Sequence, residues 1–525
     1  MSATKHSALI TWLVYLIAAV QRKHYISDAA IAGILKILSL FFVVLGRMYP
    51  QFFDIADTFP TTLYRLHGFL GTKSASIIRY VCCPNCHEVY HYSDCIKLCG
   101  TKQTSEKCTR KTGLRTCGTL LLKPIQSTTG RLVLCPIKTY CYMPIKNSLQ
   151  QLLNRPGFQE SCESWRTRNV TEGVMSDVYD GNIWKEFQQF KGKPFLSQPF
   201  TYGLMLNIDW FKPYKHLEYS VGAIYLTIMN LPRQVRFKQE NVMLVGLIPG
   251  PKEPSLTINS FLRPLIDELL SFFNGVQMSI PVGGSILVRC ALLCVACDIP
   301  ACRKVTGFLG HSATLGCSKC LKKFPGSVGN KDYSGFDTSQ WPSRHNTQHR
   351  NDVNRINVCK TKAKKKELES LLGCRYSVLL DLPYFDPIRM AIIDPMHNLY
   401  LGTAKHILKK VWHERNMIDK KDYVSLQECV DSVCVPSNLG RLPSKILSSF
   451  SGLTADQLKN WTNIFSLFAL HSHLSSDDFE CWRHFILASR ILTQMQLSTN
   501  DVELAHVLLL QFCRRVQRMY GLAHQ

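Results

Sequence analysis

The apolar runs between residues 199 and 310 constrain the fold of this chain more than any other feature. Three of them, LMLNIDWF, GAIYLTIMNLP and NVMLVGLIPG, are typical of strands, and the first alternates and is predicted to end at Asp209. The next stretch has leucines and phenylalanines at helical spacing and predicts an amphipathic helix. The run SILVRCALLCVACDIP predicts a strand buried on both faces that stops at Asp298. The predicted order is strand, strand, strand, helix, strand.

This order is that of a ribonuclease-H-like core, in which the first and fourth strands are neighbours. Asp209 and Asp298 would then meet, although they are far apart in sequence. Adjacent carboxylates repel each other unless a cation neutralises them, and hard oxygen ligands suit Mg²⁺ or Mn²⁺. A two-metal site of this kind can activate water and stabilise the leaving oxygen of a phosphodiester. The alternative is that both aspartates are helix caps or solvated strand ends.

The fold class predicted for the whole chain is a multidomain mixture of α+β and α/β structure. A helical region precedes a cysteine-rich module that resembles a zinc ribbon, and a connector leads into the ribonuclease-H-like core. A zinc-binding insertion and a helical region follow the core. The predicted boundaries are 1–75, 76–145, 146–198, 199–310, 311–360 and 361–525.

Charge favours a polyanionic partner, since 62 Lys and Arg against 38 Asp and Glu give a formal charge of +24 and a pI near 9.3. Nucleic acid is the first candidate and an anionic membrane surface the second. The apolar runs at 9–20 and 30–46 are interpreted as buried helices, with a membrane anchor as the alternative. A large chain with 22 cysteines, some of them in CxxC pairs, fits reduced, partly zinc-bound thiols inside the cell better than disulfides.

The first zinc candidate is the set Cys83, Cys86, Cys108 and Cys117. Four thiolates at this spacing can enclose zinc tetrahedrally, as in a zinc ribbon. The nearby cysteines at 82, 95 and 99 leave the ligand set open by one or two residues. The alternative is a group of reduced core cysteines.

A second candidate combines Cys317 and Cys320 of CSKC with His345 and His349 of RHNTQHR. Two thiolates and two imidazoles can close a structural zinc site. The histidine pair is otherwise a solvated polar pair. HNTQH lacks the glutamate of HExxH, which argues against a catalytic zinc.

The chain resembles the CACTA (En/Spm) superfamily of DNA transposases. The segments that carry this resemblance are LNIDWFKPYKHLEYSVGAIYLTIMNLP, LVGLIPGPKEP, FLRPLIDELL, CDIPACRKVTGFLGHSATLGCSKC, YSGFD and DPMHNLYLG, from about residue 78 onward. The resemblance implies a DDE-type transposase with an inserted zinc site. Asp209 and Asp298 are then the first two catalytic acids, and Cys317, Cys320 and the two histidines are the zinc ligands.

The third acid of that family is a glutamate in a Phe-Glu-Arg context, and the chain reaches Gln525 before such a motif. Asp394 and His397, in IIDPMHNLYLG, are the available stand-ins, with a helix cap as the alternative for Asp394. We therefore expect an incomplete chain that is inactive alone, because metal geometry suffers without a third acid.

Three other features carry alternatives. The lysine-rich run near 361–367 is a solvated helix face or a phosphate contact. The aromatic residues of the helical region are core or a base-stacking platform, and three arginines form a basic helix face with the same choice. The residues are Trp461, Phe465, Phe468, Trp482 and Phe485 for the aromatic set, and Arg514, Arg515 and Arg518 for the basic set.

The leading hypothesis is a nuclear transposase that hydrolyses and transfers DNA phosphodiesters at transposon ends with Mg²⁺ or Mn²⁺, and that contains structural Zn²⁺. Its partners would be double-stranded DNA and further copies of itself, with no membrane. One rival is a non-catalytic DNA-binding protein derived from a transposon. The other is a zinc-dependent adaptor for proteins, which would lack salt-sensitive DNA affinity.

Overall fold

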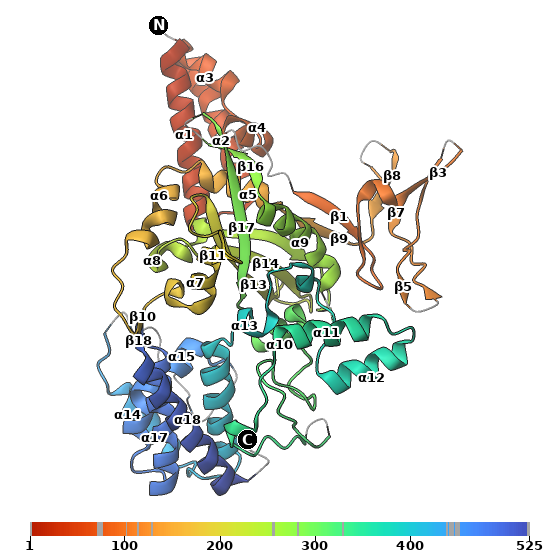
Figure 1. Ribbon diagram of the computed structural model, residues 1–525. Coiled ribbons are helices and arrows are strands. Elements are labelled where there is room, and N and C mark those ends of the chain that lie inside the picture. The colour runs from red at the N-terminus through yellow and green to blue at the C-terminus, as the bar shows by residue number, and fades with distance from the viewer. Residues whose placement is uncertain are drawn as a thin grey trace. The chain divides into compact units, whose positions relative to one another are not determined.

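The structure is a computed structural model that describes residues 3–70, 77–100, 102–112, 115–127, 130–254, 258–280, 283–327, 330–436, 439, 446 and 452–521 (Figure 1). The chain forms two compact units, Met1–Ile78 and Arg79–Gln525. The predicted boundary at residue 75 lies outside the described residues.

The first unit is helical, as its apolar runs predict. It contains α1 (Ala3–His24), α2 (Asp28–Met48), η1 (Pro50–Phe52), α3 (Phe53–Thr58) and α4 (Leu63–Phe69). Ser27 caps α2 by accepting the backbone N–H of Ala30 at 3.3 Å. Ile31 and Leu35 of α2 are in the core, whereas Ile37 and Leu40 are 68% and 66% exposed. The prediction of buried helices is therefore met on one face only.

By length and composition, α2 is also apolar enough to cross a membrane, and 22% of its most apolar window is buried. The absence of a membrane partner stays a prediction.

The second unit is built on a curled eight-stranded sheet in the order β16-β17-β13-β14-β15-β9-β1-β2. Its long strands are β13 (Thr201–Phe211), β14 (Val221–Ile228), β15 (Val242–Ile248) and β17 (Ser285–Val295). β13 is antiparallel to β14 and parallel to β17, so the first and fourth predicted strands are neighbours. The short strand β16 (Val276–Ser279) forms a hairpin with β17 that the sequence analysis does not predict.

Burial of alternate residues sets the two faces of β13. Leu204, Leu206 and Ile208 are at most 2% exposed, whereas Asn207 is half-buried and Asp209 exposed. The amphipathic helix α9 (Asn259–Asn274) covers the sheet with its predicted apolar residues. Those that are buried are Phe261, Leu262, Leu265, Ile266, Leu269 and Phe272.

The cysteine-rich module lies between β1 (Ile78–Cys82) and β9 (Thr139–Tyr142), which belong to the large sheet together with β2 (Val89–Tyr90). Three small antiparallel hairpins make up the rest of the module, after η2 (Tyr92–Cys95). They are β3 (Ile96–Cys99) with β4 (Lys102–Ser105), β5 (Lys111–Thr112) with β6 (Arg115–Thr116), and β7 (Leu122–Gln126) with β8 (Leu132–Pro136).

Short elements connect this module to the core and link the core strands. The connector contains α5 (Ile145–Leu153), α6 (Phe158–Glu163), η3 (Ser164–Thr167), β10 (Val174–Met175), η4 (Val178–Asp180), α7 (Asn182–Gln188), β11 (Gln189–Phe190) and β12 (Lys193–Pro194). Between β14 and β15 lie α8 (Arg233–Arg236) and η5 (Gln239–Asn241). Asp180 fastens the connector, because its carboxylate accepts the backbone N–H groups of Ser176 and Asp177 and pairs with Arg168.

After β17 comes α10 (Ile299–Thr306), and the described part of the predicted insertion 311–360 has little regular structure before α11 (Asn346–Asn357). The remaining elements before the helical end are η6 (Thr338–Gln340), α12 (Lys362–Leu372), η7 (Val378–Asp381) and α13 (Pro387–Met390). No residue of α12 is buried, which is what a solvated lysine-rich face predicts.

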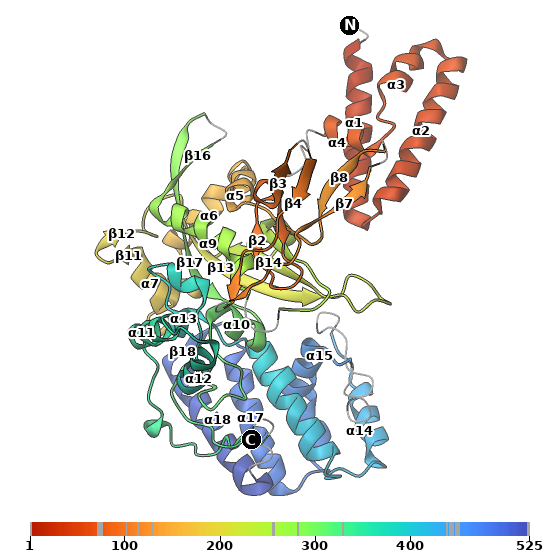
Figure 2. The same cartoon turned by 90° about the vertical axis from the view of Figure 1, so that its right-hand side faces the viewer.

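Helices gather at one end of the second unit, below the central sheet in both views (Figures 1 and 2). They are the π-helical segments η8 (Met396–Ala404), η9 (Ile407–His413) and η11 (Trp461–Phe465), with α14 (Asp422–Asp431), α15 (Ala455–Asn460), α16 (Ser466–Leu470), α17 (Ser476–Leu492) and α18 (Thr499–Tyr520). β18 (Leu497–Ser498) pairs with β10.

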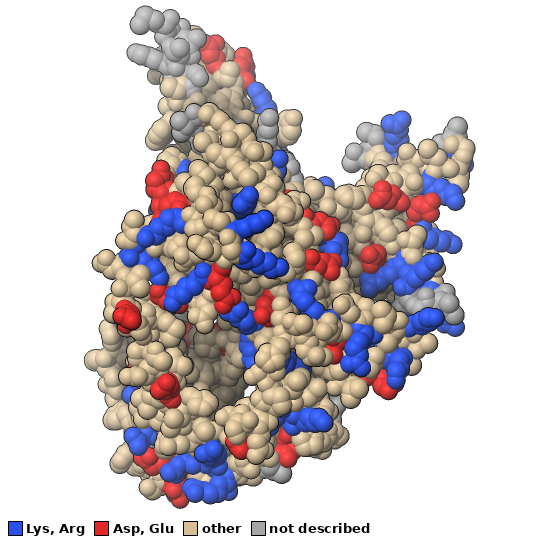
Figure 3. All heavy atoms as spheres, in the orientation of Figure 1, with Lys and Arg blue, Asp and Glu red and all other residues tan. Residues whose placement is uncertain are grey.

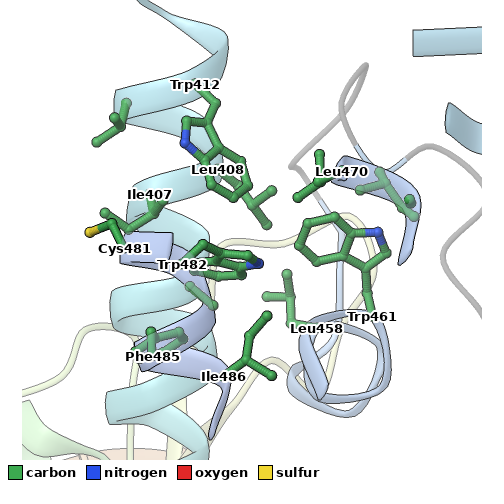
Figure 4. Close-up of a cluster of buried hydrophobic side chains, with 14 of the residues drawn as sticks. Ile407, Leu408, Trp412, Leu458, Trp461, Leu470, Cys481, Trp482, Phe485 and Ile486 are labelled. Atoms are coloured by element: carbon green, nitrogen blue, oxygen red, sulfur yellow. The ribbon is translucent and has the colours of Figure 1, made fainter. Parts of the chain in front are cut away.

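The aromatic anchors of this helical end form a core around Trp482 (Figure 4). Its ring centroid lies 5.0 Å from that of Trp412, 6.2 Å from Trp461 and 5.1 Å from Phe485. Phe468 is the exception at 61% exposure. The aromatic set is therefore mainly core, with one residue facing solvent.

Candidate active site and metal centres

A pocket opens where β17 ends beside β13. Here the Ala296 backbone N–H donates to the Leu206 carbonyl at 2.9 Å, and the Asn207 side-chain amide donates to the Ala296 carbonyl at 2.6 Å. The Ile208 backbone N–H then donates to Cys297 Sγ at 3.2 Å. Beyond Leu206, β13 continues to Phe211 paired only with β14. The side of β13 that β17 leaves is therefore open to a ligand.

The pocket has a volume of about 340 Å³, and Asp209, Asp298 and Asp394 all line it. Asn207 and His397 are also in its wall, and among the described residues no lysine or arginine lines it. Three carboxylates without a lining cation are unusual in a chain with a formal charge of +24. Such a donor set fits a divalent cation with hard oxygen ligands, Mg²⁺ or Mn²⁺.

Asp209 lies two residues inside the end of β13, not at the end as predicted from the sequence, and pairs with Ala223 of β14. The strand continues because Trp210 and Phe211 keep the extended pairing with β14. One oxygen of Asp209 accepts the backbone N–H of Trp210 at 2.8 Å. The exposed side chain points to the same face as Asn207, two residues earlier.

Asp298 is the N-cap of α10 and accepts the Ala301 backbone N–H at 2.7 Å. The helix-cap alternative therefore holds for this residue, and it does not exclude a second role in the pocket. Burial raises the pKa of the neighbouring Cys297 thiol, and the charges of Asp298 and Asp209 raise it further. Both carboxylates thus disfavour the thiolate of the same buried cysteine.

Asp394 reaches the pocket because its chain runs beside the end of β17. Ala391 forms a parallel bridge with Val295, and Asp394 follows three residues later. One oxygen of Asp394 accepts the Met396 backbone N–H at 2.8 Å, and the other contacts Nδ1 of His397. The two stand-in residues are therefore in direct contact.

The three carboxylates share a pocket without forming a tight cluster. In the part of the chain that the structure describes, just one set of three or more His, Cys, Asp or Glu residues has all its ligand atoms within 4.8 Å of one another, and it is made of cysteines. A cation bound by the acids would have to draw the carboxylates together.

That cysteine set is Cys83, Cys86, Cys108 and Cys117, the four residues predicted from their spacing. The Sγ atoms of Cys83 and Cys117 lie 3.8 Å apart, and those of Cys86 and Cys108 lie 3.4 Å apart. The other three candidates point elsewhere. Cys82 and Cys95 are buried, with Sγ against the carbonyls of Cys83 and His91, and Cys99 is exposed. The cluster can hold a metal ion such as zinc.

Polar groups around the cysteine cluster favour the deprotonated thiolate form of Cys117. A hydrogen bond from the Thr119 hydroxyl and others, including one from Asn85, lower the pKa of Cys117 to about 6. Burial raises the pKa of Cys86 and Cys108. Because metal ligation requires thiolates, a bound cation would help the half-buried Cys86 and the buried Cys108 to lose their protons.

The second predicted set is less compact. Cys317 and Cys320 form a knuckle in which the backbone N–H groups of Lys319 and Cys320 donate to Cys317 Sγ at 3.3 and 3.4 Å. The buried Arg344 guanidinium donates to the carbonyls of Cys317 and Cys320 at 2.9 and 3.2 Å. Ser343 forms an antiparallel β-bridge with Cys320. The segment that contains the two histidines therefore starts beside the knuckle.

The two histidines differ in surroundings. His345 is exposed at the start of α11, whereas His349 is 2% exposed and packs 4.9 Å from the ring of Phe308. Neither ring nitrogen of His349 has a hydrogen-bond partner, and burial lowers the pKa of His349 to about 4. A buried imidazole with two unpaired nitrogens fits a metal ligand. The complete set of Cys317, Cys320, His345 and His349 stays a prediction.

Comparison with known proteins adds the class of protein. Residues 172–354 match Transposase family tnp2. The chain as a whole matches no curated protein. The matched part, about a third of the chain, includes Asp209, Asp298 and the second zinc candidate, and excludes the cysteine cluster and Asp394. This similarity supports a transposase-like function and an origin in a transposable element.

Some residues of these sites were not predicted from the sequence. Asn207 shares its face with Asp209, and the two-residue period of a strand is a signal that finds it. Thr119 and Asn85 contact Cys117 across the cluster, and only the fold brings them there.

Proposed function

We propose that the chain is the catalytic part of a DDE-type DNA transposase of the CACTA (En/Spm) kind. It would hydrolyse and transfer phosphodiesters at transposon ends. The observation that carries the proposal is the pocket lined by Asp209, Asp298 and Asp394, with no lysine or arginine in the described part of its wall. A site of this charge binds a divalent cation more readily than it binds a phosphodiester alone.

The sheet supports the proposed ribonuclease-H-like core. The order β15-β14-β13-β17, with β13 and β17 parallel, is the arrangement expected of that core. It brings the ends of the first and fourth strands together, which is the placement that paired metal ligands need.

In the proposed reaction, carboxylate oxygens of Asp209 and Asp298 would hold the cations at the pocket. Mg²⁺ or Mn²⁺, when bound, supplies water activation and stabilises the leaving oxygen. His397 contacts the Asp394 carboxylate and orients it toward the pocket. Asn207 holds the end of β17 against β13 through the Ala296 carbonyl, which keeps the pocket walls in place.

We propose DNA as the partner because the cysteine-rich module carries a net positive charge. Residues 79–142 contain ten Lys and Arg against three Asp and Glu, a formal charge of +7. In Figure 3 blue side chains are prominent on the side where the small hairpins lie. Zinc at the cysteine cluster would hold hairpins that are too short to be stable alone. We also propose a nuclear location and assembly of several copies at transposon ends.

A non-catalytic DNA-binding protein is the second candidate. It is favoured by the local hydrogen bonds that the three aspartates already accept from the backbone N–H groups of Trp210, Ala301 and Met396. Capping aspartates of this kind need no cation.

Strand cleavage of a DNA substrate in Mn²⁺ separates the two candidates. With Asp394 in the pocket in place of the expected glutamate, the chain should cleave and not be inactive alone, and Asp209→Asn and Asp298→Asn should each lower the rate at least ~100-fold. Asp337→Asn is the matched control, because Asp337 caps η6 outside the pocket. Salt-sensitive DNA binding without cleavage would select the second candidate, and absence of such binding would favour a protein adaptor.

A further inference from the structure

Lys319 lies inside the CxxC knuckle of the insertion. Its backbone N–H donates to Cys317 Sγ at 3.3 Å, and its carbonyl accepts the Arg344 backbone N–H at 3.0 Å. The backbone position of Lys319 is therefore set by the shape of the knuckle.

The side chain of Lys319 leaves the knuckle and holds the chain that leads to the acid pocket. Its Nζ donates to the Ile388 carbonyl and, at 2.6 Å, to the Ala391 carbonyl. Ala391 is the residue that bridges Val295 at the end of β17, three residues before Asp394. The ammonium group thus adds a second hold on the approach of Asp394, beside the bridge between Ala391 and Val295.

Arg350 makes a second connection from the other half of the insertion. It follows the buried His349 on α11 and donates to the carbonyls of Leu380, Leu382 and Phe385 at 2.7, 3.1 and 2.7 Å. Each half of the predicted zinc site is therefore next to a positively charged side chain, Lys319 or Arg350, that holds the segment 380–391.

We propose that Lys319, supported by Arg350, is a positioning residue that transmits the state of the Cys317–His349 insertion to Asp394. The inference rests on the proposed function and deepens it. When the knuckle keeps its shape, Asp394 stays in the pocket with Asp209 and Asp298. When the knuckle loosens, the segment before Asp394 loses its anchor and the third carboxylate leaves the pocket.

The test uses Fe²⁺ as a substitute for the divalent cation, with hydrogen peroxide and ascorbate added, because the hydroxyl radicals that peroxide forms at bound iron cut the backbone nearby. In the full chain the cuts should fall near residues 209, 298 and 394. Lys319→Met should remove the cut near 394 and keep the other two, and Arg350→Met should weaken the same cut. Mn²⁺ affinity should fall about 10- to 100-fold in Lys319→Met, as for other residues that support metal ligands.

Lys322→Met is the matched control. Lys322 follows the same knuckle and is half-buried like Lys319, but its Nζ donates to the carbonyls of Tyr333 and Gly335. It should keep all three cuts. Cys317→Ser should reproduce the Lys319→Met pattern, and Cys86→Ser, in the separate cysteine cluster, should not.

The outcomes distinguish a failure of the proposed function from a failure of the role proposed for Lys319. No iron-dependent cut in the wild-type chain overturns the proposed function and this inference with it. Three cuts in the wild type that persist in Lys319→Met and Arg350→Met overturn this inference alone. If Lys319→Met fails to fold, Arg350→Met and Cys317→Ser decide, and retention of the cut near 394 in both rejects the proposal.

Discussion

The backbone N–H of Ile392 donates to the carbonyl of Val295 at 3.0 Å, and this bond joins two segments about a hundred residues apart. Val295 ends β17, and Asp298 follows it. Ile392 precedes Asp394 by two residues. The bond therefore explains why aspartates from the fourth strand and from the chain beyond the insertion reach one pocket.

The two roles of Asp298 can be separated by substitution. Asn is as good an N-cap as Asp, so Asp298→Asn should keep the hydrogen bond to Ala301 and leave the free energy of unfolding nearly unchanged. Asp298→Ala should lower that free energy by about 1 kcal/mol. Both should abolish Mn²⁺-dependent cleavage. Denaturant titration and a cleavage assay measure the two effects, and an active Asp298→Asn protein would assign the residue to capping alone.

The cysteine cluster predicts a zinc content that depends on particular thiols. Cys117→Ala should remove one zinc per chain, measured by mass spectrometry of the metal, and should expose the hairpins around it to protease. Cys99→Ala is the matched control, since Cys99 is exposed in the same module and outside the cluster. Equal zinc loss in both variants would contradict the assignment of the four ligands.

The basic module predicts a salt-dependent affinity for DNA. Lys111→Gln and Arg115→Gln, on the exposed β5–β6 hairpin, should each weaken binding and lower the salt slope by about 1 if the side chain contacts a phosphate. Lys364 is already paired with Glu367 at 3.1 Å on the solvated α12, so Lys364→Gln should leave the slope unchanged. Binding curves at several salt concentrations measure this slope. A slope that changes only in Lys364→Gln would show that α12, and not the β5–β6 hairpin, contacts the DNA.

Asp180 predicts a pH-dependent stability in the connector. Burial opposes its charge, but hydrogen bonds from Ser176 and Asp177 and the charge of Arg168 lower the net pKa. Because the pKa of Asp180 is lower in the folded state, its charge stabilises the fold at pH values above the ordinary Asp pKa of about 3.9. This stability is lost as the pH falls through the pKa of Asp180 in the folded state. Asp180→Asn should cost about 2 kcal/mol at pH 7. Thermal unfolding should show the difference from wild type shrinking below about pH 4, and a constant difference would contradict the charge argument.

The central strands could be predicted because their patterns are strong. The alternation of Leu204, Leu206 and Ile208 predicts the buried face of β13, and the apolar run before Asp298 predicts a strand buried on both sides. Asp209 was placed wrongly at a strand end, because pairing with β14 extends β13 by two residues that carry no distinct signal. The β16–β17 hairpin was missed for a similar reason, since β16 is short and partly exposed.

The sites were predictable where spacing carries the chemistry. The CxxC spacing, together with the later cysteines, identified the four thiols that meet in the fold. The contribution of Lys319 could not be predicted, because its role depends on carbonyls about seventy residues away that only the tertiary structure brings near. Phe468 shares the spacing of the core aromatics but is exposed, which only packing decides.

Crystallography with Mn²⁺ tests the central claim most directly, because the anomalous signal of manganese identifies the ion and its ligands. We predict a manganese peak in the pocket, bound by carboxylate oxygens of Asp209 and Asp298, with Asp394 turned toward it. A pocket without manganese, at a concentration that saturates cleavage by active transposases, would contradict the nuclease assignment. A basic scaffold with a zinc module would then be the better description of the chain.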